Sequence, residues 1–230
     1  MNERTTNQKL DERTTNRSGS GETDVAADLR IDIEKLGVLN ELGERGVECV
    51  ERRLARLIES DTSVASELVK SGYVEPSSVE LKFRDERRLG VEVRVQGVPP
   101  GTVLVLFPPS SANNAARLLL EHTDEDPATV SNEMAVSALV ELGGMMANGF
   151  LDALADTFDQ HIAAGAPSTV NSTTRAVVER IVERHDDRGL YLATTLHVTS
   201  HDIEVEVYLF PQNRTFVKIL NLVDIEAVSR

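Results

Sequence analysis

The fold is decided by a stretch that the chain carries twice, Leu39-Asn40-Glu41-Leu42-Gly43 and Leu139-Val140-Glu141-Leu142-Gly143. Each copy lies in a segment whose apolar residues recur at three- and four-residue steps, which is typical of one face of an α-helix. The first helix is expected to begin near Asp32, and the second to run from about Asn132 to Phe158. The sequence therefore predicts two long helices that share a Glu-Leu-Gly signature.

Strands and shorter helices are expected around these two helices. Valines that alternate with polar residues over 91–96 predict a half-buried strand, and the apolar run over 103–107 predicts a strand covered on both faces. Further strands are expected over 190–198, 203–210 and 216–220. Short turns between successive strands favour antiparallel pairing. Helical patterns at about 111–121 and 174–184 complete the set.

The two halves match beyond the long helices. At an offset of one hundred positions Leu54-Ala55 matches Leu154-Ala155, and downstream Leu106-Phe107-Pro108 is echoed by Leu209-Phe210-Pro211. Because the order of elements recurs as well, internal duplication is the better interpretation. We therefore predict an α+β fold in which both long helices pack on one face of a shared, largely antiparallel sheet with a pseudo-two-fold axis.

The predicted organisation is one domain behind a tail. Residues 1–28 are polar and turn-rich, so they cannot bury enough apolar surface to offset the entropy of ordering them, and we expect a disordered tail. Residues 29–230 are expected to form a single domain of two repeats, about 32–125 and 130–225.

The charge balance excludes some classes of partner. With 38 acidic and 24 basic residues the formal net charge is -14, and such a surface repels nucleic-acid phosphates and anionic lipid headgroups. Abundant carboxylates with few lysines suit a salt-loaded cytoplasm, where screening weakens self-repulsion. A halophilic, archaeal source is therefore one hypothesis, and an ordinary acidic mesophile protein is the other.

The remaining composition points to the cytoplasm. Cys49 is the only cysteine, so no intrachain disulfide can form. The N-terminus lacks the apolar core of a signal peptide. The sequence has no run of about 18 apolar residues, so no membrane-spanning segment is expected.

On these residues the chain resembles the CheC/CheX/FliY family of chemotaxis phosphatases, and its CheC-like members in particular, which have two such helices. The family's motif is Asp or Ser, three residues, Glu, two residues, Asn, then twenty-two residues and Pro. In the second half, Ser137, Glu141 and Pro167 stand at those positions, but Gly144 replaces the Asn. The first half is further from the motif at all its positions except the Glu, with Gly37, Glu41, Glu44 and Glu67.

The resemblance implies a substrate, the phospho-aspartate of the response regulator CheY. Its Asn would position the attacking water, its Glu would pair with a Lys of the regulator, and the Mg²⁺ would belong to CheY, so no cofactor or metal of this chain is expected. Gly144 cannot hold a water. Glu44 would bring a carboxylate to an anionic phosphoryl group, at a cost of roughly 3 kcal/mol for two unit charges ~5 Å apart. Asn148, about 6 Å further along the helix axis, is the candidate for a displaced substitute, and the alternative is an ordinary polar residue of the helix.

Two functions from different classes follow, and the sequence leaves open whether the chain is an enzyme. One is a CheC-like protein that engages phosphorylated CheY with weak or lost phosphatase activity, through Glu41, Glu141, Ser137 and Asn148. The other is a non-catalytic adaptor that binds the deamidase CheD or another chemotaxis partner. Other catalytic sites are not indicated, because the five histidines lack zinc-site spacing and the chain has no phosphate-binding Gly-rich loop.

Overall fold

The computed structural model describes Ile31 and residues 35–58, 64–67, 69–120, 132–184 and 189–223. The predicted tail, residues 1–28, lies outside the described residues, so the division of the chain into a tail and a domain stays a prediction. The two long helices are present as α2 (Leu36–Ile58) and α5 (Asn132–Phe158). The second begins and ends at the residues that the apolar period predicted.

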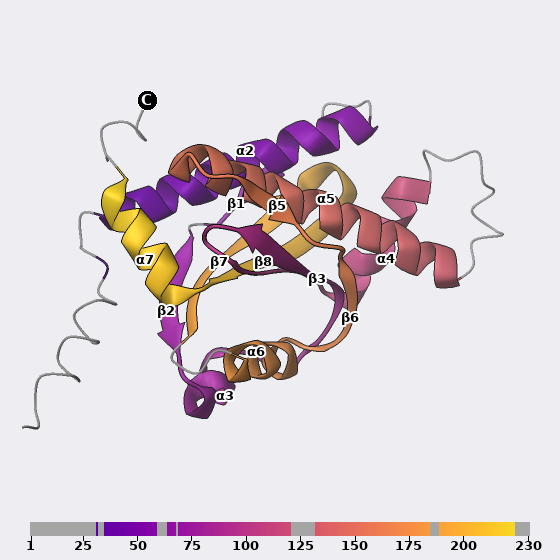
Figure 1. Cartoon of the computed structure of the whole chain (residues 1–230). Coiled ribbons are helices and arrows are strands. Elements are labelled where there is room, and N and C mark those ends of the chain that lie inside the picture. Colours follow the sequence, from indigo (N-terminus) through magenta and orange to yellow (C-terminus); the bar gives the residue numbers. More distant parts are fainter. Residues whose placement is uncertain are drawn as a thin grey trace, which may run out of the picture.

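The strands form one curled sheet of eight strands, in the order β1-β7-β8-β4-β3-β5 (Figure 1). At one edge β2 pairs with β7 beyond β1, and at the other edge β6 pairs with β3 beyond β5. Every strand pair is antiparallel. The predicted α+β fold with a largely antiparallel sheet is therefore confirmed. The strands are β1 (Val64–Ser66), β2 (Lys70–Val74), β3 (Arg87–Gly97), β4 (Gly101–Phe107), β5 (Ile162–Ala164), β6 (Ser168–Thr173), β7 (Gly189–Val198) and β8 (Ile203–Pro211).

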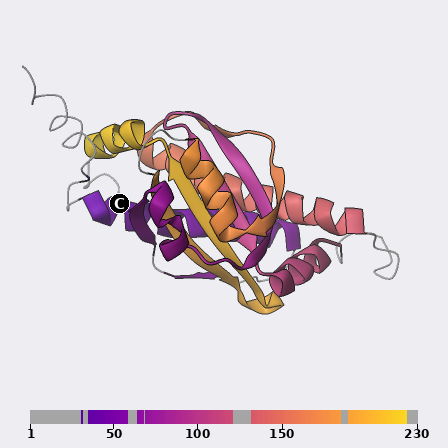
Figure 2. The ribbon, with the colours of Figure 1, turned by 90° about the horizontal axis from the view of Figure 1, so that it is seen from below.

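Helices cover both faces of this sheet. On one face α2 and α5 lie side by side and bury the larger apolar core, which includes Leu39, Leu142 and Met146 (Figures 1 and 2). The opposite face carries α3 (Val79–Lys82) and α6 (Thr174–Glu183) over a smaller core. The remaining helical elements are α4 (Pro109–Leu120), α7 (Asn213–Leu222) and the short 3-10 turns η2 (Pro76–Ser78) and η4 (Thr199–His201).

The two halves repeat the same order of elements: helix, two short strands, a short helical segment, two long strands and a final helix. The pairing of the central strands is symmetric at an offset of 103 positions. Leu104 of β4 pairs with Tyr208 of β8. The position 103 residues after Leu104 is Val207 and the position 103 residues before Tyr208 is Val105, and these two residues also pair with each other. Each half also lends its first two strands to the other half's sheet edge. This geometry is what a duplicated gene would encode, and the duplication itself stays a prediction.

One predicted strand is wrong. Residues 216–220 belong to the helix α7, not to a strand. Phe216, Val217 and Leu220 are buried while Lys218 is exposed, which is the spacing of a helix face and not the alternation of a strand. The apolar, partly β-branched composition of this short segment fits either element, and its burial pattern distinguishes them.

The alternation along β3 predicts that Glu92 faces solvent, and this prediction is wrong. Glu92 is buried beneath α6, where Arg180 donates to it at 2.6 Å and Arg184 at 2.7 Å. Burial alone would raise the pKa of this carboxyl, but the two guanidinium groups outweigh burial and lower it. The segment after β6 turns back over the sheet as a helix, so both faces of β3 are covered.

Among the described helices, α5 is long and apolar enough to cross a membrane by length and composition alone. Core helices of soluble proteins pass the same test. In this fold α5 packs against α2 and the sheet, which accounts for its apolar character.

Candidate functional site

The Glu-Leu-Gly signature is in part a packing device. Its leucine is buried in both copies, and its glycine lies where the helix approaches a valine so closely that no side chain fits. A Cβ on Gly43 would overlap Val69, and a Cβ on Gly143 would lie 2.7 Å from Cγ2 of Val91. Leucine and glycine thus fix the helix on the sheet, and the glutamate before them points elsewhere.

In the second half the predicted site residues come together. Ser137, Glu141, Gly144, Asn148 and Pro167 line one open cleft along the outer side of α5, with a volume of about 610 Å³. Pro167 follows β5, and its ring lies beside Gly144 of the helix. The other lining residues are Arg53, Val136, Val140, Met145 and Thr169.

The floor of this cleft is open at Gly144. A Cβ built there would meet only Pro167, whose Cγ would lie 3.6 Å away, an ordinary van der Waals distance. Glu141 is exposed, and no described side chain pairs with its carboxylate. The cleft therefore presents an available carboxylate beside a position where a side chain would fit and none is present.

The chain resembles known proteins in sequence and in fold. No protein-family model matches the chain. CheC1 of Halobacterium salinarum, provisionally named a CheY-P phosphatase, is 25% identical over 192 residues, which are 83% of this chain and 97% of that protein. The structure of FliY from Thermotoga maritima covers 84% of this chain and 96% of its own, with a TM-score of 0.63 at 12% identity. The chain is thus similar to a CheC protein in sequence and to FliY in fold.

A second solved structure shares the fold of this CheC-like chain. FliM of H. pylori, in its complex with SpeE, superposes with a TM-score of 0.58 at 11% identity, over 84% of this chain and 95% of that one. At such low identity the likeness concerns the fold alone. The motif positions therefore have to be judged from this chain's own side chains.

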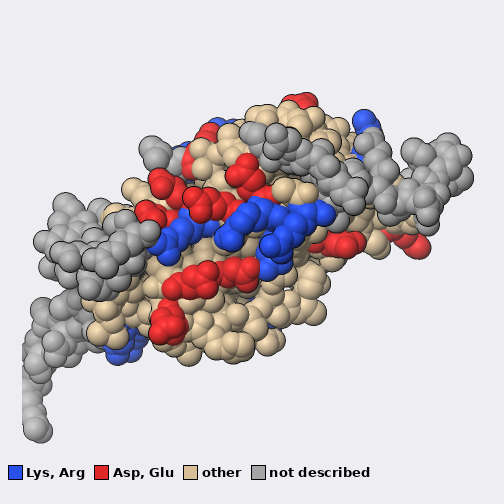
Figure 3. All heavy atoms as spheres, turned by 90° about the horizontal axis from the view of Figure 1, so that it is seen from above, with Lys and Arg blue, Asp and Glu red and all other residues tan. Residues whose placement is uncertain are grey.

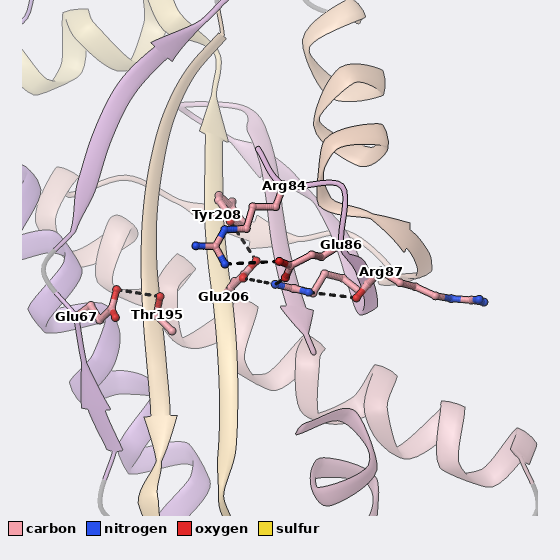
Figure 4. Close-up of polar contacts among 8 residues, drawn as sticks. Glu67, Arg84, Glu86, Arg87, Thr195, Glu206 and Tyr208 are labelled. Carbon is pink, nitrogen blue, oxygen red and sulfur yellow. Dashed lines mark hydrogen bonds and ion pairs between the residues drawn. The ribbon is translucent and has the colours of Figure 1, made fainter. Parts of the chain in front are cut away.

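The first copy of the motif is arranged differently. Glu41 forms an ion pair with Arg45 one turn along α2, at 3.2 Å, and Gly37 and Glu44 are exposed. Glu67, in the place of the proline, hydrogen-bonds with Thr195 of β7 at 3.2 Å and with Lys70 at 3.4 Å (Figure 4). The bonds from Lys70 and then Thr195 lower the pKa of the Glu67 carboxyl. At this motif position the first copy thus has Glu67, a charged residue that is hydrogen-bonded to its neighbours, whereas the second copy has Pro167 beside its helix.

One charged residue of the cleft lies outside the motif. Arg53 belongs to α2, yet it lines the cleft on α5, and its guanidinium forms an ion pair with Asp152 of that helix. No local pattern signals this contact, because its partners are 99 positions apart and meet only when the two helices pack. Close helix packing makes it possible, since a Cβ on Gly149 would lie 3.0 Å from the backbone nitrogen of Val50.

The face formed by α2 and α5 is strongly charged. Figure 3 shows a band of Lys and Arg side chains bordered on both sides by Asp and Glu. The arginines of α2 that reach the surface are Arg45, Arg52, Arg53 and Arg56. A chain that is acidic overall therefore presents alternating charge on this face.

Among the described residues, neither a metal site nor a reactive cysteine stands beside this cleft. Within the described ranges, no group of three or more His, Cys, Asp and Glu side chains could hold a metal ion. Cys49 is buried and accepts a hydrogen bond from Nη2 of Arg52 at 3.0 Å, so it is a packed residue and not an exposed nucleophile.

The second face of the sheet carries a polar network (Figure 4). The buried Arg88 donates to Glu206 at 2.9 Å and to Glu86 at 3.0 Å, and the Tyr208 hydroxyl donates to Glu206 at 3.1 Å. Burial, followed by the neighbouring Glu206, raises the pKa of that hydroxyl. Since its charges are paired with one another, the network is suited to joining β3 to β8.

Proposed function

We propose that this CheC-like protein engages phosphorylated CheY through the cleft on α5 and hydrolyses its phospho-aspartate weakly or not at all. The observation that carries the proposal is the cleft itself, which gathers Ser137, Glu141 and Pro167 around a glycine. The relative from H. salinarum supports the substrate, because its provisional name describes a CheY-P phosphatase and the similarity spans nearly its whole length.

Docking and hydrolysis make different demands on this cleft. Docking needs an accessible carboxylate for a cation of the regulator, and Glu141 is exposed. Hydrolysis needs a group that holds water in line with the phosphorus, within a fraction of an ångström. Gly144 has no such group, and Asn148 lies about one helical turn, or ~6 Å, further along the axis. The cleft is thus suited to binding more than to turnover.

An adaptor that binds CheD or another chemotaxis partner is the second candidate. It is favoured by the same glycine, because a cleft without a water-positioning amide still offers a docking surface. A cytoplasmic location and a halophilic, archaeal source belong to the proposal as well, and the source of the CheC1 relative supports the latter.

Replacing Glu141 tests the docking role. We expect Glu141→Ala to weaken binding of phosphorylated CheY by ~1–3 kcal/mol, the range for loss of a charge-assisted contact. Isothermal titration with the cognate regulator measures this change. Glu133→Ala is the matched control, since Glu133 is an exposed carboxylate on the same helix outside the cleft.

Equal affinity of the two alanine variants and the unaltered protein would contradict docking through α5. Failure of the unaltered protein to bind phosphorylated CheY would exclude the first function and leave the adaptor.

A further inference from the structure

Beside the Mg²⁺ that would belong to CheY, a cation of this chain would stabilise a phosphoryl group bound in the α5 cleft. The phosphoryl group carries close to two negative charges, and the exposed carboxylate of Glu141 is on the same cleft. At ~5 Å and an effective dielectric of about 20, each pair of like unit charges costs roughly 3 kcal/mol. Among the residues that line the cleft, Arg53 is the only one with a positive charge.

The position of Arg53 suits this task. Its side chain is 36% exposed, so the guanidinium is accessible to a ligand. Asp152 holds the guanidinium over α5, one turn beyond Asn148. Because the pair with Asp152 uses part of a group that has five N–H donors, further donors are available toward the cleft.

We propose that Arg53 recognises the phosphoryl group of the docked regulator and thereby makes binding depend on phosphorylation. This inference rests on the proposed function, and it adds a specificity-determining residue that lies on the opposite helix from the motif. Arginine is suited to the role because its planar fork donates two parallel hydrogen bonds to phosphate oxygens. A cleft that lacks a water-positioning group would then retain phosphate recognition without hydrolysis.

The fold should tolerate a change at this position. The Arg53–Asp152 pair is between partly exposed side chains, with 36% and 52% exposure, and such pairs contribute little to stability. Arg53→Gln removes the positive charge but keeps a polar side chain. Arg53→Lys keeps the charge but loses the planar guanidinium that donates two parallel hydrogen bonds. Arg56→Gln makes the same charge change one turn along α2, at an exposed residue outside the cleft.

The test is the affinity of each variant for the cognate regulator in two forms, free and carrying beryllofluoride as a stable stand-in for the phosphoryl group. We expect Arg53→Gln to lower affinity for the beryllofluoride form by about tenfold and to leave affinity for the free form unchanged. Arg53→Lys should lose part of the preference, and Arg56→Gln should keep all of it. Thermal unfolding of each variant checks that the domain is intact.

The outcomes separate this inference from the proposed function. If the unaltered protein prefers the beryllofluoride form and Arg53→Gln keeps that preference, the role of Arg53 is wrong and the docking function stands. If both arginine-to-glutamine variants lose affinity equally for both forms, the effect is general charge attraction and the inference fails. If the unaltered protein binds neither form, the proposed function fails, and the role of Arg53 fails with it.

Discussion

Gly143 and Gly144 are neighbours on α5 with opposite surroundings. Gly143 is buried against Val91 of the sheet, where a Cβ would lie 2.7 Å from Cγ2 of that valine. Gly144 faces the cleft, where a Cβ would meet only Pro167 at 3.6 Å. The first glycine is therefore required by packing, whereas the second is compatible with a side chain.

Alanine at each position gives a matched pair. We expect Gly144→Ala to raise the free energy of unfolding by about 0.5–1 kcal/mol, because alanine is the better helix former. Gly143→Ala should lower it by about 1–3 kcal/mol, since the overlap with Val91 outweighs the same gain. Chemical denaturation measures both. Equal effects of the two changes would show that the helix does not approach the sheet as closely at Gly143 as described.

The sequence predicts part of this candidate site. The resemblance to the family's motif pointed to Ser137, Glu141 and Gly144 along one helix, and the structure places them with Pro167 on one cleft. Arg53 could not be found in this way, because its place depends on how α2 packs against α5. Spacing within one element is readable from a sequence, whereas contact between two elements is set by tertiary packing.

Whole elements show the same limit. The long helices and the strands β7 and β8 were predictable because their apolar periods persist over many residues. The helix α7 was not, since Phe216, Val217 and Leu220 span too few residues to separate one period from another. Glu92 was assigned to the solvent side for a related reason, because alternation along β3 does not reveal that α6 covers its second face.

Glu92 ties α6 to the sheet, and its contribution should depend on pH. Its pKa in the folded protein lies below the ordinary value of 4.5, so the stabilisation is present above that pH and is lost as the pH falls through the lower folded pKa. We expect Glu92→Gln to cost about 1–2 kcal/mol near neutral pH, less than a fully buried pair because both arginines are partly exposed.

Urea unfolding of Glu92→Gln and the unaltered protein across an acid pH series tests this expectation. The difference between the two proteins should shrink as the pH falls below 4.5. A difference that stays constant over that range would show that the carboxylate charge is not what holds α6.

At the scale of the whole molecule, charge and symmetry act together. Two halves with the same order of elements exchange their short edge strands, so neither half can complete its sheet alone. The domain should accordingly unfold as a single unit. Its net charge of -14 opposes compaction through repulsion between carboxylates.

Stability should consequently rise with salt. Cations in molar potassium chloride screen the surface carboxylates, which relieves a repulsion that is stronger in the compact state than in the unfolded chain. Thermal unfolding midpoints in low and molar potassium chloride measure the effect. The same midpoint in both would remove the support that the charge gives to a halophilic source.

The central claim is that the cleft on α5 is a CheC-like site without the group that positions water. The most direct measurement is the rate at which phosphorylated cognate CheY decays with the unaltered protein, with Gly144→Ala and with Gly144→Asn, at equal concentrations. The unaltered protein and the alanine variant should accelerate decay little or not at all. Gly144→Asn should accelerate it by about tenfold or more, because a Cβ has room beside Pro167 and the carboxamide it carries supplies a group that can position water. Rapid decay with the unaltered protein would contradict the account.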